Sequence, residues 1–252
     1  MLFLVCCLVA REGLFSCVRY REWLGVGMGT GSDPVVESVR GGSGRGDGPG
    51  SSSFVARTGP VERIVWFDVE TTGLDPECDL ALEVGARVTD MRGVRVLDRD
   101  YQALIDVGDL GSVMDRADER VQRLHSESGL WADLWSAGSG AKPVGLVDVE
   151  LTAWLESAVD GDRGTVFYFG GNSVAFDRAV ARVDFPMFSQ HFSHRLIDAT
   201  CLSLFVKAVG GPKFHKVGTA HRALADALSS LEEYRHYVAW AESSPSARVG
   251  AA

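Results

Sequence analysis

The chain has 252 residues, 46% of them hydrophobic, which is enough for one domain with a full core. Its formal net charge of −9 argues against a protein that binds long nucleic acid through counterion release. Metal ions can still offset the negative charge locally where a short substrate binds. Five cysteines without a CxxC pair argue against a zinc ribbon and favour a reduced, cytoplasmic setting.

The chain begins with an apolar stretch of ten residues, which is too short to span a bilayer, so we expect no membrane partner. Residues 1–58 are rich in Gly and Ser after that stretch and are expected to form a disordered extension, because they cannot bury enough apolar surface. Residues 59–242 are expected to form the folded domain and residues 243–252 a flexible tail.

The domain is expected to begin with three strands and to continue with alternating strands and helices. Strands are predicted over residues 63–68, 80–89, 94–105, 165–169 and 195–198, with a hairpin turn at 90–93. Helices are predicted within 114–158 in two or three pieces, over 173–182, from the last strand through 209, and over 220–239 after a loop at 210–218. This order predicts an α/β fold, a mixed five-stranded sheet flanked by helices.

Two carboxylates, Asp68 and Glu70, stand at the end of the first predicted strand. A strand has a period of two, so both side chains face the same side, where their charges repel unless a proton or a cation separates them. A divalent cation would resolve that conflict, so the pair indicates half of a metal site. The alternative is an Asp that caps a turn beside a solvated Glu.

Three segments together resemble the DEDDh exonuclease superfamily, which has a ribonuclease H-like fold. They are FDVETTGLD at 67–75, GNSVAFD at 171–177 and HRALAD at 221–226. The resemblance implies 3′–5′ exonuclease activity that releases 5′-mononucleotides and needs two Mg²⁺ or Mn²⁺ ions. It implies His221 as general base and four carboxylates as metal ligands: Asp68, Glu70, Asp177 and Asp226.

Within that superfamily, residues 61–240 are most similar to the oligoribonucleases, notably at 123–130, 195–200 and 234–237. The resemblance implies a substrate of short single-stranded RNA and a homodimer. It implies that Leu74 wedges between two bases, that Ser173 and Arg195 hold the 5′ phosphate, and that His125 contacts the same end. His194 stands where the family has a Tyr that reaches across the dimer interface into the partner's site.

Other interpretations stay open at this stage. Leu74 could be core, Arg195 a surface charge, Ser173 only a helix N-cap and His125 an exposed side chain. Because Thr71-Thr72-Gly73 is similar to the proofreading subunit of bacterial DNA polymerase III, the alternative substrate is DNA, in an exonuclease of the proofreading or ribonuclease T type. Two further alternatives are an inert adaptor with a nuclease fold and a structural protein tethered by its N-terminus.

Overall fold

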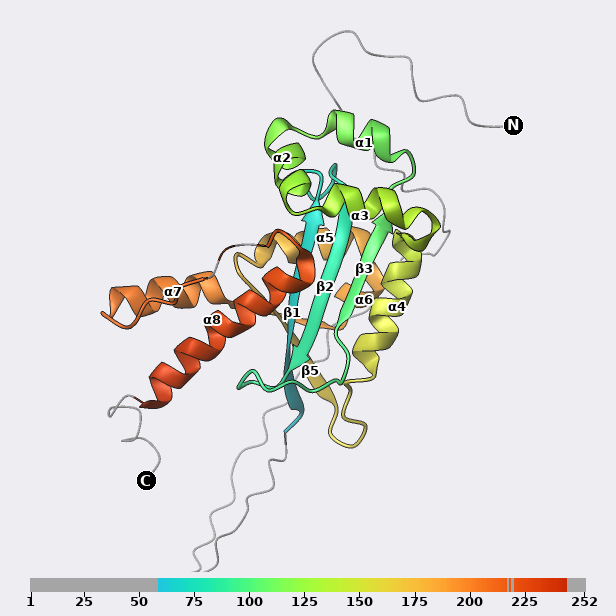
Figure 1. Cartoon of the computed structure of the whole chain (residues 1–252). Helices are drawn as coiled ribbons and strands as arrows, with labels where there is room; N and C mark the ends of the chain where they lie inside the picture. The colour runs from blue at the N-terminus through green and yellow to red at the C-terminus, as the bar shows by residue number, and fades with distance from the viewer. Residues whose placement is uncertain (1–58, 217, 219, 244–252) are drawn as a thin grey trace, which may run out of the picture. The chain divides into compact units, whose positions relative to one another are not determined.

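The computed structural model describes residues 59–243 except 217 and 219. The predicted extension over residues 1–58 lies outside the described residues, as does the predicted tail from residue 244 on. The described domain is built on one mixed six-stranded sheet with the order β4-β3-β2-β1-β5-β6 (Figure 1). The strands are β1 (Val61–Thr71), β2 (Ala81–Thr89), β3 (Tyr101–Asp106), β4 (Lys142–Pro143), β5 (Thr165–Gly171) and β6 (Phe192–Asp198). β2 is antiparallel to β1 and β3, whereas β5 runs parallel to β1 and β6.

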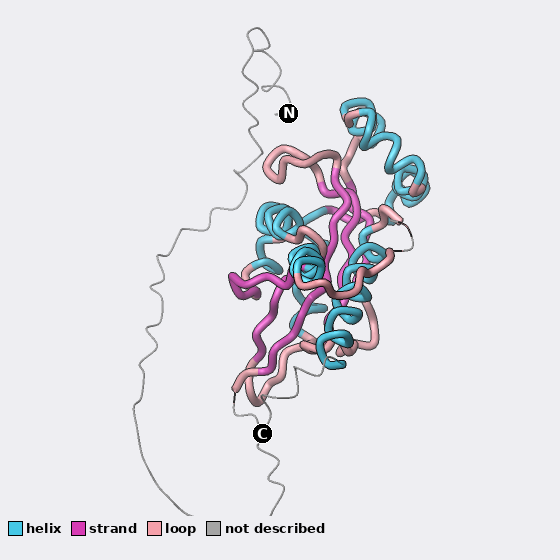
Figure 2. The backbone as a smooth tube through the Cα atoms, turned by 90° about the vertical axis from the view of Figure 1, so that its left-hand side faces the viewer, coloured by secondary structure: helices cyan, strands magenta, loops and turns pink. Residues whose placement is uncertain are grey.

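Helices cover both faces of this sheet, as Figure 2 shows. α8 crosses one face over β1 and β2, while α4, α5 and α6 pack on the other, and α1 to α3 lie beyond the carboxyl ends of β1 and β3 (Figure 1). The helices are α1 (Leu110–Arg116), α2 (Glu119–Glu127), α3 (Leu130–Ala137), α4 (Val144–Glu156), α5 (Ala175–Asp184), α6 (Pro186–Ser189), α7 (Ala199–Ala208) and α8 (Ala223–Ser243). This is the predicted ribonuclease H-like arrangement of a mixed sheet between helices.

The alternation of side chains along β1 divides the core and sets the direction of the carboxylates. Val65, Phe67 and Val69 enter the main core with α4, α5 and α6. Ile64 and Trp66 point the other way and pack against α8. Because a strand has a period of two, Asp68 and Glu70 continue the side that faces α8.

Several element predictions were wrong in detail. The third strand begins at Tyr101 instead of residue 94, because Asp100 binds both Arg87 and Arg95 and holds the preceding residues in a loop with one isolated bridge to β2. The sheet has a sixth strand, β4, whose two residues are too few to leave a periodic pattern. The last helix begins at Ala223 instead of residue 220.

Across the described residues, each helix falls short of the length and apolar character needed to cross a membrane.

Candidate metal centre

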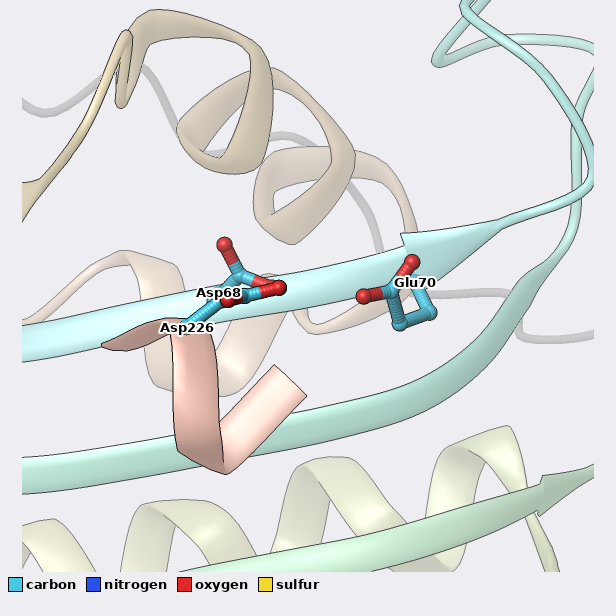
Figure 3. A group of neighbouring side chains, drawn as sticks. All are labelled: Asp68, Glu70 and Asp226. Atoms are coloured by element: carbon cyan, nitrogen blue, oxygen red, sulfur yellow. The ribbon is translucent and has the colours of Figure 1, made fainter. Parts of the chain in front are cut away.

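Three carboxylates converge where the end of β1 meets the start of α8. Asp68, Glu70 and Asp226 each offer an oxygen, and these three oxygens lie within 4.8 Å of one another. Figure 3 shows Asp226 reaching Asp68 from α8, with Glu70 further along the same strand. Two residues of β1 and one of the first turn of α8 therefore bring three of the predicted carboxylates together.

Asp177 reaches the same strand from the first turn of α5. β1 and β5 are paired only as far as Trp66 and Gly170, so the backbone of β1 beyond that point is open on the β5 side. There the Val69 N–H donates a hydrogen bond to Asp177 Oδ1 at 3.2 Å. The fourth predicted carboxylate is therefore buried next to the residue that follows Asp68, and it is not one of the three whose oxygens lie within 4.8 Å of one another.

The start of α8 approaches β2 very closely and so brings Asp226 to the carboxylates of β1. Gly85 of β2 permits this approach, because a Cβ at that position would lie 2.2 Å from the backbone nitrogen of Leu224. His221 precedes the helix with a φ of 47°, the left-handed region that only a few per cent of non-glycine residues adopt. Its backbone conformation explains why the helix begins later than predicted.

The carboxylates of the centre are electrostatically unfavourable without a cation. Burial raises the pKa of Glu70 to about 7, with further contributions from Asp226, Glu83 and Asp177. Burial also raises the pKa of Asp177 to about 7 and, with the charge of Asp177, holds the pKa of Asp68 well above its usual range. A divalent cation stabilises the ionised forms, and hard cations prefer carboxylate oxygens, so this donor set fits Mg²⁺ or Mn²⁺.

His125 of α2 lies inside the protein, only 2% exposed, so the alternative of an exposed side chain is wrong. Its Nε2 is 2.9 Å from the carbonyl oxygen of Thr71, and its ring packs edge-on against Trp131. Its Nδ1 is 3.9 Å from Glu70 Oε2 and has no hydrogen-bond partner among the described residues. His125 thus borders the centre next to Glu70.

The other predicted substrate residues are exposed. Leu74 lies after β1 with 82% of its surface accessible, so it is not a core residue. Ser173 follows β5, and its backbone N–H donates to Asp198 Oδ1 at 3.2 Å and Thr200 Oγ1 at 3.1 Å. Its side chain makes no capping bond, since the residue that caps α5 is Val174. His194 and Arg195 are exposed neighbours on β6.

Two residues close to the centre were not predicted to matter. Glu83 of β2 is completely buried, and two nitrogens of Arg222 donate hydrogen bonds to its carboxylate at 2.9 and 3.0 Å. A charged residue inside the apolar run of the second strand was the available signal for Glu83. Arg222 lies within the third motif, but the sequence carried no signal for its role.

The sequence matches the exonuclease family over residues 65–234. It is 31% identical over 190 residues to an oligoribonuclease of Corynebacterium efficiens, a match that covers 73% of this chain and 81% of that protein. It is 30% identical over 178 residues to a probable oligoribonuclease of Schizosaccharomyces pombe, covering 69% of this chain and 66% of the relative.

A solved apo structure of exonuclease I is also similar, with a TM-score of 0.46 and 13% identity. That match covers 72% of this chain and 44% of exonuclease I, so this chain spans less than half of that protein. The exonuclease family is dependent on divalent metal ions, and the three clustered carboxylates are a group that could hold one such ion. This chain belongs to the exonuclease family, and it is a 3′–5′ exonuclease of the oligoribonuclease type.

Proposed function

We propose that this exonuclease degrades short single-stranded oligoribonucleotides from their 3′ ends to 5′-mononucleotides. The observation that carries the proposal is the convergence of Asp68, Glu70 and Asp226, whose oxygens lie within 4.8 Å of one another, with Asp177 beside them. We assign these four carboxylates as ligands of two Mg²⁺ or Mn²⁺ ions. When bound, two such metal ions would stabilise the negative charge at the scissile phosphate and lower the pKa of the attacking water.

The side chains have distinct roles in this proposal. Asp68 and Glu70 come from the central strand β1, which fixes their positions in the sheet. Asp226 completes the carboxylate cluster from the first turn of α8. Asp177 is oriented by the Val69 N–H, which fixes one of its oxygens. His221 accepts the proton of the attacking water, a role that histidine fills more often than any other side chain.

The exposed residues around the centre form the substrate contacts of the proposal. Leu74 presents an apolar side chain to solvent directly after β1, where it can wedge between two bases. Arg195 offers a planar fork of donors for a 5′ phosphate, and Ser173 adds a hydroxyl at the end of the neighbouring strand. The family resemblance also assigns His125 to this end, although its ring is buried beside Glu70 and not exposed. The family resemblance adds a homodimer in which His194 reaches the partner's site.

The experiment is a hydrolysis assay on 5′-labelled RNA and DNA of about two to ten nucleotides, lengths that reach into the range of single-strand binding sites. Each substrate is tested with Mg²⁺, with Mn²⁺ and with a chelator. We expect 5′-mononucleotides from RNA dimers and trimers and no product with chelator. Faster hydrolysis of the longer DNA than of the RNA dimers would establish the DNA-directed alternative.

Asp68→Ala provides the matching variant. Loss of groups that merely orient metal ligands lowers activity about 10- to 100-fold, so loss of this proposed ligand should lower it at least about 100-fold. Asp162→Ala is the control, because Asp162 is exposed in the loop before β5, at the end of the sheet opposite the centre. An Asp68→Ala protein that cleaves at the wild-type rate contradicts the assignment.

A further inference from the structure

Glu83 is a charged side chain in the middle of the sheet, and it is 0% exposed. Arg222 Nε and Nη2 donate to its two oxygens at 3.0 and 2.9 Å. Gln102 Nε2 donates to it at 2.8 Å and the Ala223 N–H at 3.0 Å. A buried carboxylate needs such partners, because the interior offers no water to replace them.

These hydrogen bonds meet at the junction where the last loop becomes α8. Ala223 is the first residue of the helix, so Glu83 accepts from an N–H that has no partner inside the helix. Arg222 also donates to Asp133 Oδ2 of α3 at 2.6 Å. The junction is therefore joined to β2 and to α3 by side chains that are distant in sequence.

The junction lies directly between two residues of the proposed centre. His221 precedes Arg222, and Asp226 stands in the first turn of the helix that Glu83 caps. A left-handed backbone at a non-glycine residue such as His221 persists only where the surroundings fix it. The bonds from Arg222 and Ala223 to Glu83 provide that constraint on the next two residues.

We propose that Glu83 and Arg222 are positioning residues of the exonuclease, which hold His221 and Asp226 in register with Asp68 and Glu70. The proposal rests on the function proposed above, because it takes His221 and Asp226 as parts of the centre. Arg222 suits the task because its planar guanidinium fixes a carboxylate at two points, which a lysine cannot do. A displacement of about 1 Å at such a centre can lower the rate about 100-fold.

A second ion pair on the same strand provides a matched control. Arg87 of β2 binds Asp100 with two nitrogens at 2.8 and 2.6 Å, and its side chain is 18% exposed against 24% for Arg222. The Arg87 pair holds the loop before β3, and among the described residues the side-chain hydrogen bonds of Arg87 go to Asp100. The charge of α8 that acts on Arg87 is Glu232, which lies further along the helix than residues 221–227. Arg87→Met therefore removes a two-point arginine–carboxylate pair of the same strand outside the junction, and Arg95 still binds Asp100.

The experiment compares Arg222→Met, Arg222→Lys and Arg87→Met with the wild-type protein on an RNA dimer. We expect Arg222→Met to lower kcat about 10- to 100-fold with KM within about threefold, because the catalytic groups move while the substrate contacts stay. Arg222→Lys should recover part of the loss, and Arg87→Met should keep the wild-type kcat. Glu83→Gln tests the partner and should behave like Arg222→Met where it folds.

Hydrogen–deuterium exchange provides a measurement that does not depend on activity. Amides of residues 221–227 should exchange faster in Arg222→Met than in wild type, and those residues should be unaffected in Arg87→Met. The affinity for Mn²⁺, measured by calorimetry, should also fall in Arg222→Met only. These two measurements apply even if the wild-type protein cleaves none of the substrates, so the failure of the proposed function is distinguished from the failure of this inference.

The inference is overturned if a folded Arg222→Met protein shows wild-type exchange at residues 221–227. It is equally overturned if exchange rises while kcat stays within twofold of an active wild type. A loss of kcat that Arg87→Met shares to the same degree assigns the effect to general stability and also overturns the positioning role.

Discussion

Asp68 of β1 is paired with Gly85 on the neighbouring strand β2, so the residue opposite the first carboxylate of the centre has no side chain. The first turn of α8 fills that space, with the Leu224 nitrogen 2.2 Å from where a Cβ would stand. The approach of α8, and with it of Asp226, depends on this glycine.

Gly85→Ala should therefore lower both stability and activity. Overpacking a tight site costs about 1–3 kcal/mol, and here the obstructing atoms are backbone, which cannot rotate away. Chemical denaturation with urea measures the first effect and hydrolysis of an RNA dimer the second. Gly145→Ala in α4 is the control, because a Cβ there meets no atom within 4 Å. Equal stability of the two variants would show that α8 does not need this approach.

His221→Gly should separate stability from catalysis. Glycine adopts the φ of 47° found at His221 without steric cost, so the folded protein should lose little stability, less than about 1 kcal/mol. The rate should fall about 100- to 10,000-fold, the usual contribution of a general base. Thermal unfolding and single-turnover hydrolysis measure the two quantities. Near-normal turnover would exclude the proposed role of the imidazole.

Leu74→Ala should affect substrate binding without affecting the fold. The side chain is 82% exposed, so unfolding should change by no more than about 0.5 kcal/mol. We expect KM for an RNA dimer to rise several-fold, since the wedge contributes to holding the bases. Leu204→Ala on α7, which is 62% exposed, is the control and should leave KM unchanged. A Leu74→Ala protein with normal KM would remove the wedge assignment.

The metal-free protein should lose stability as the pH rises towards neutral. The pKa of Glu70 is raised from its ordinary value of 4.5 to about 7, and that of Asp177 from 3.8 to about 7. Between these values the folded state holds protons that the unfolded state has released. Unfolding therefore releases protons, and stability decreases with rising pH across this window.

Mn²⁺ should reverse that loss, because a bound cation favours the ionised carboxylates and stabilises only the folded state. The measurement is the melting temperature between about pH 4.5 and pH 7.5, with chelator and with Mn²⁺. Asp68→Ala should flatten the Mn²⁺ response. A melting temperature of the chelated protein that rises across the window would contradict the raised pKa values.

Local patterns were sufficient to predict most of the fold. The apolar run before Asp68 predicted the central strand, and Leu224, Leu228 and Leu231 at helical spacing predicted the last helix. Spacing within a strand also predicted that Asp68 and Glu70 share a side. These features depend on neighbours in sequence, and periodicity reports them directly.

The errors arose where distant residues decide the structure. The start of the third strand depends on Asp100 binding Arg87 and Arg95, which no window around residue 94 reveals. The start of α8 depends on Glu83, a residue of β2. His125 was assigned to a site by resemblance alone, and its burial next to Glu70 depends on how α2 packs. Such long-range partners cannot be found from the periodicity of one segment.

The carboxylate cluster draws its members from the first strand and the last helix of the described domain. During synthesis β1 leaves the ribosome long before α8, so a nascent chain carries Asp68 and Glu70 without Asp226. A polypeptide interrupted before that helix therefore holds only part of the cluster, and the proposal predicts that it cannot hydrolyse RNA.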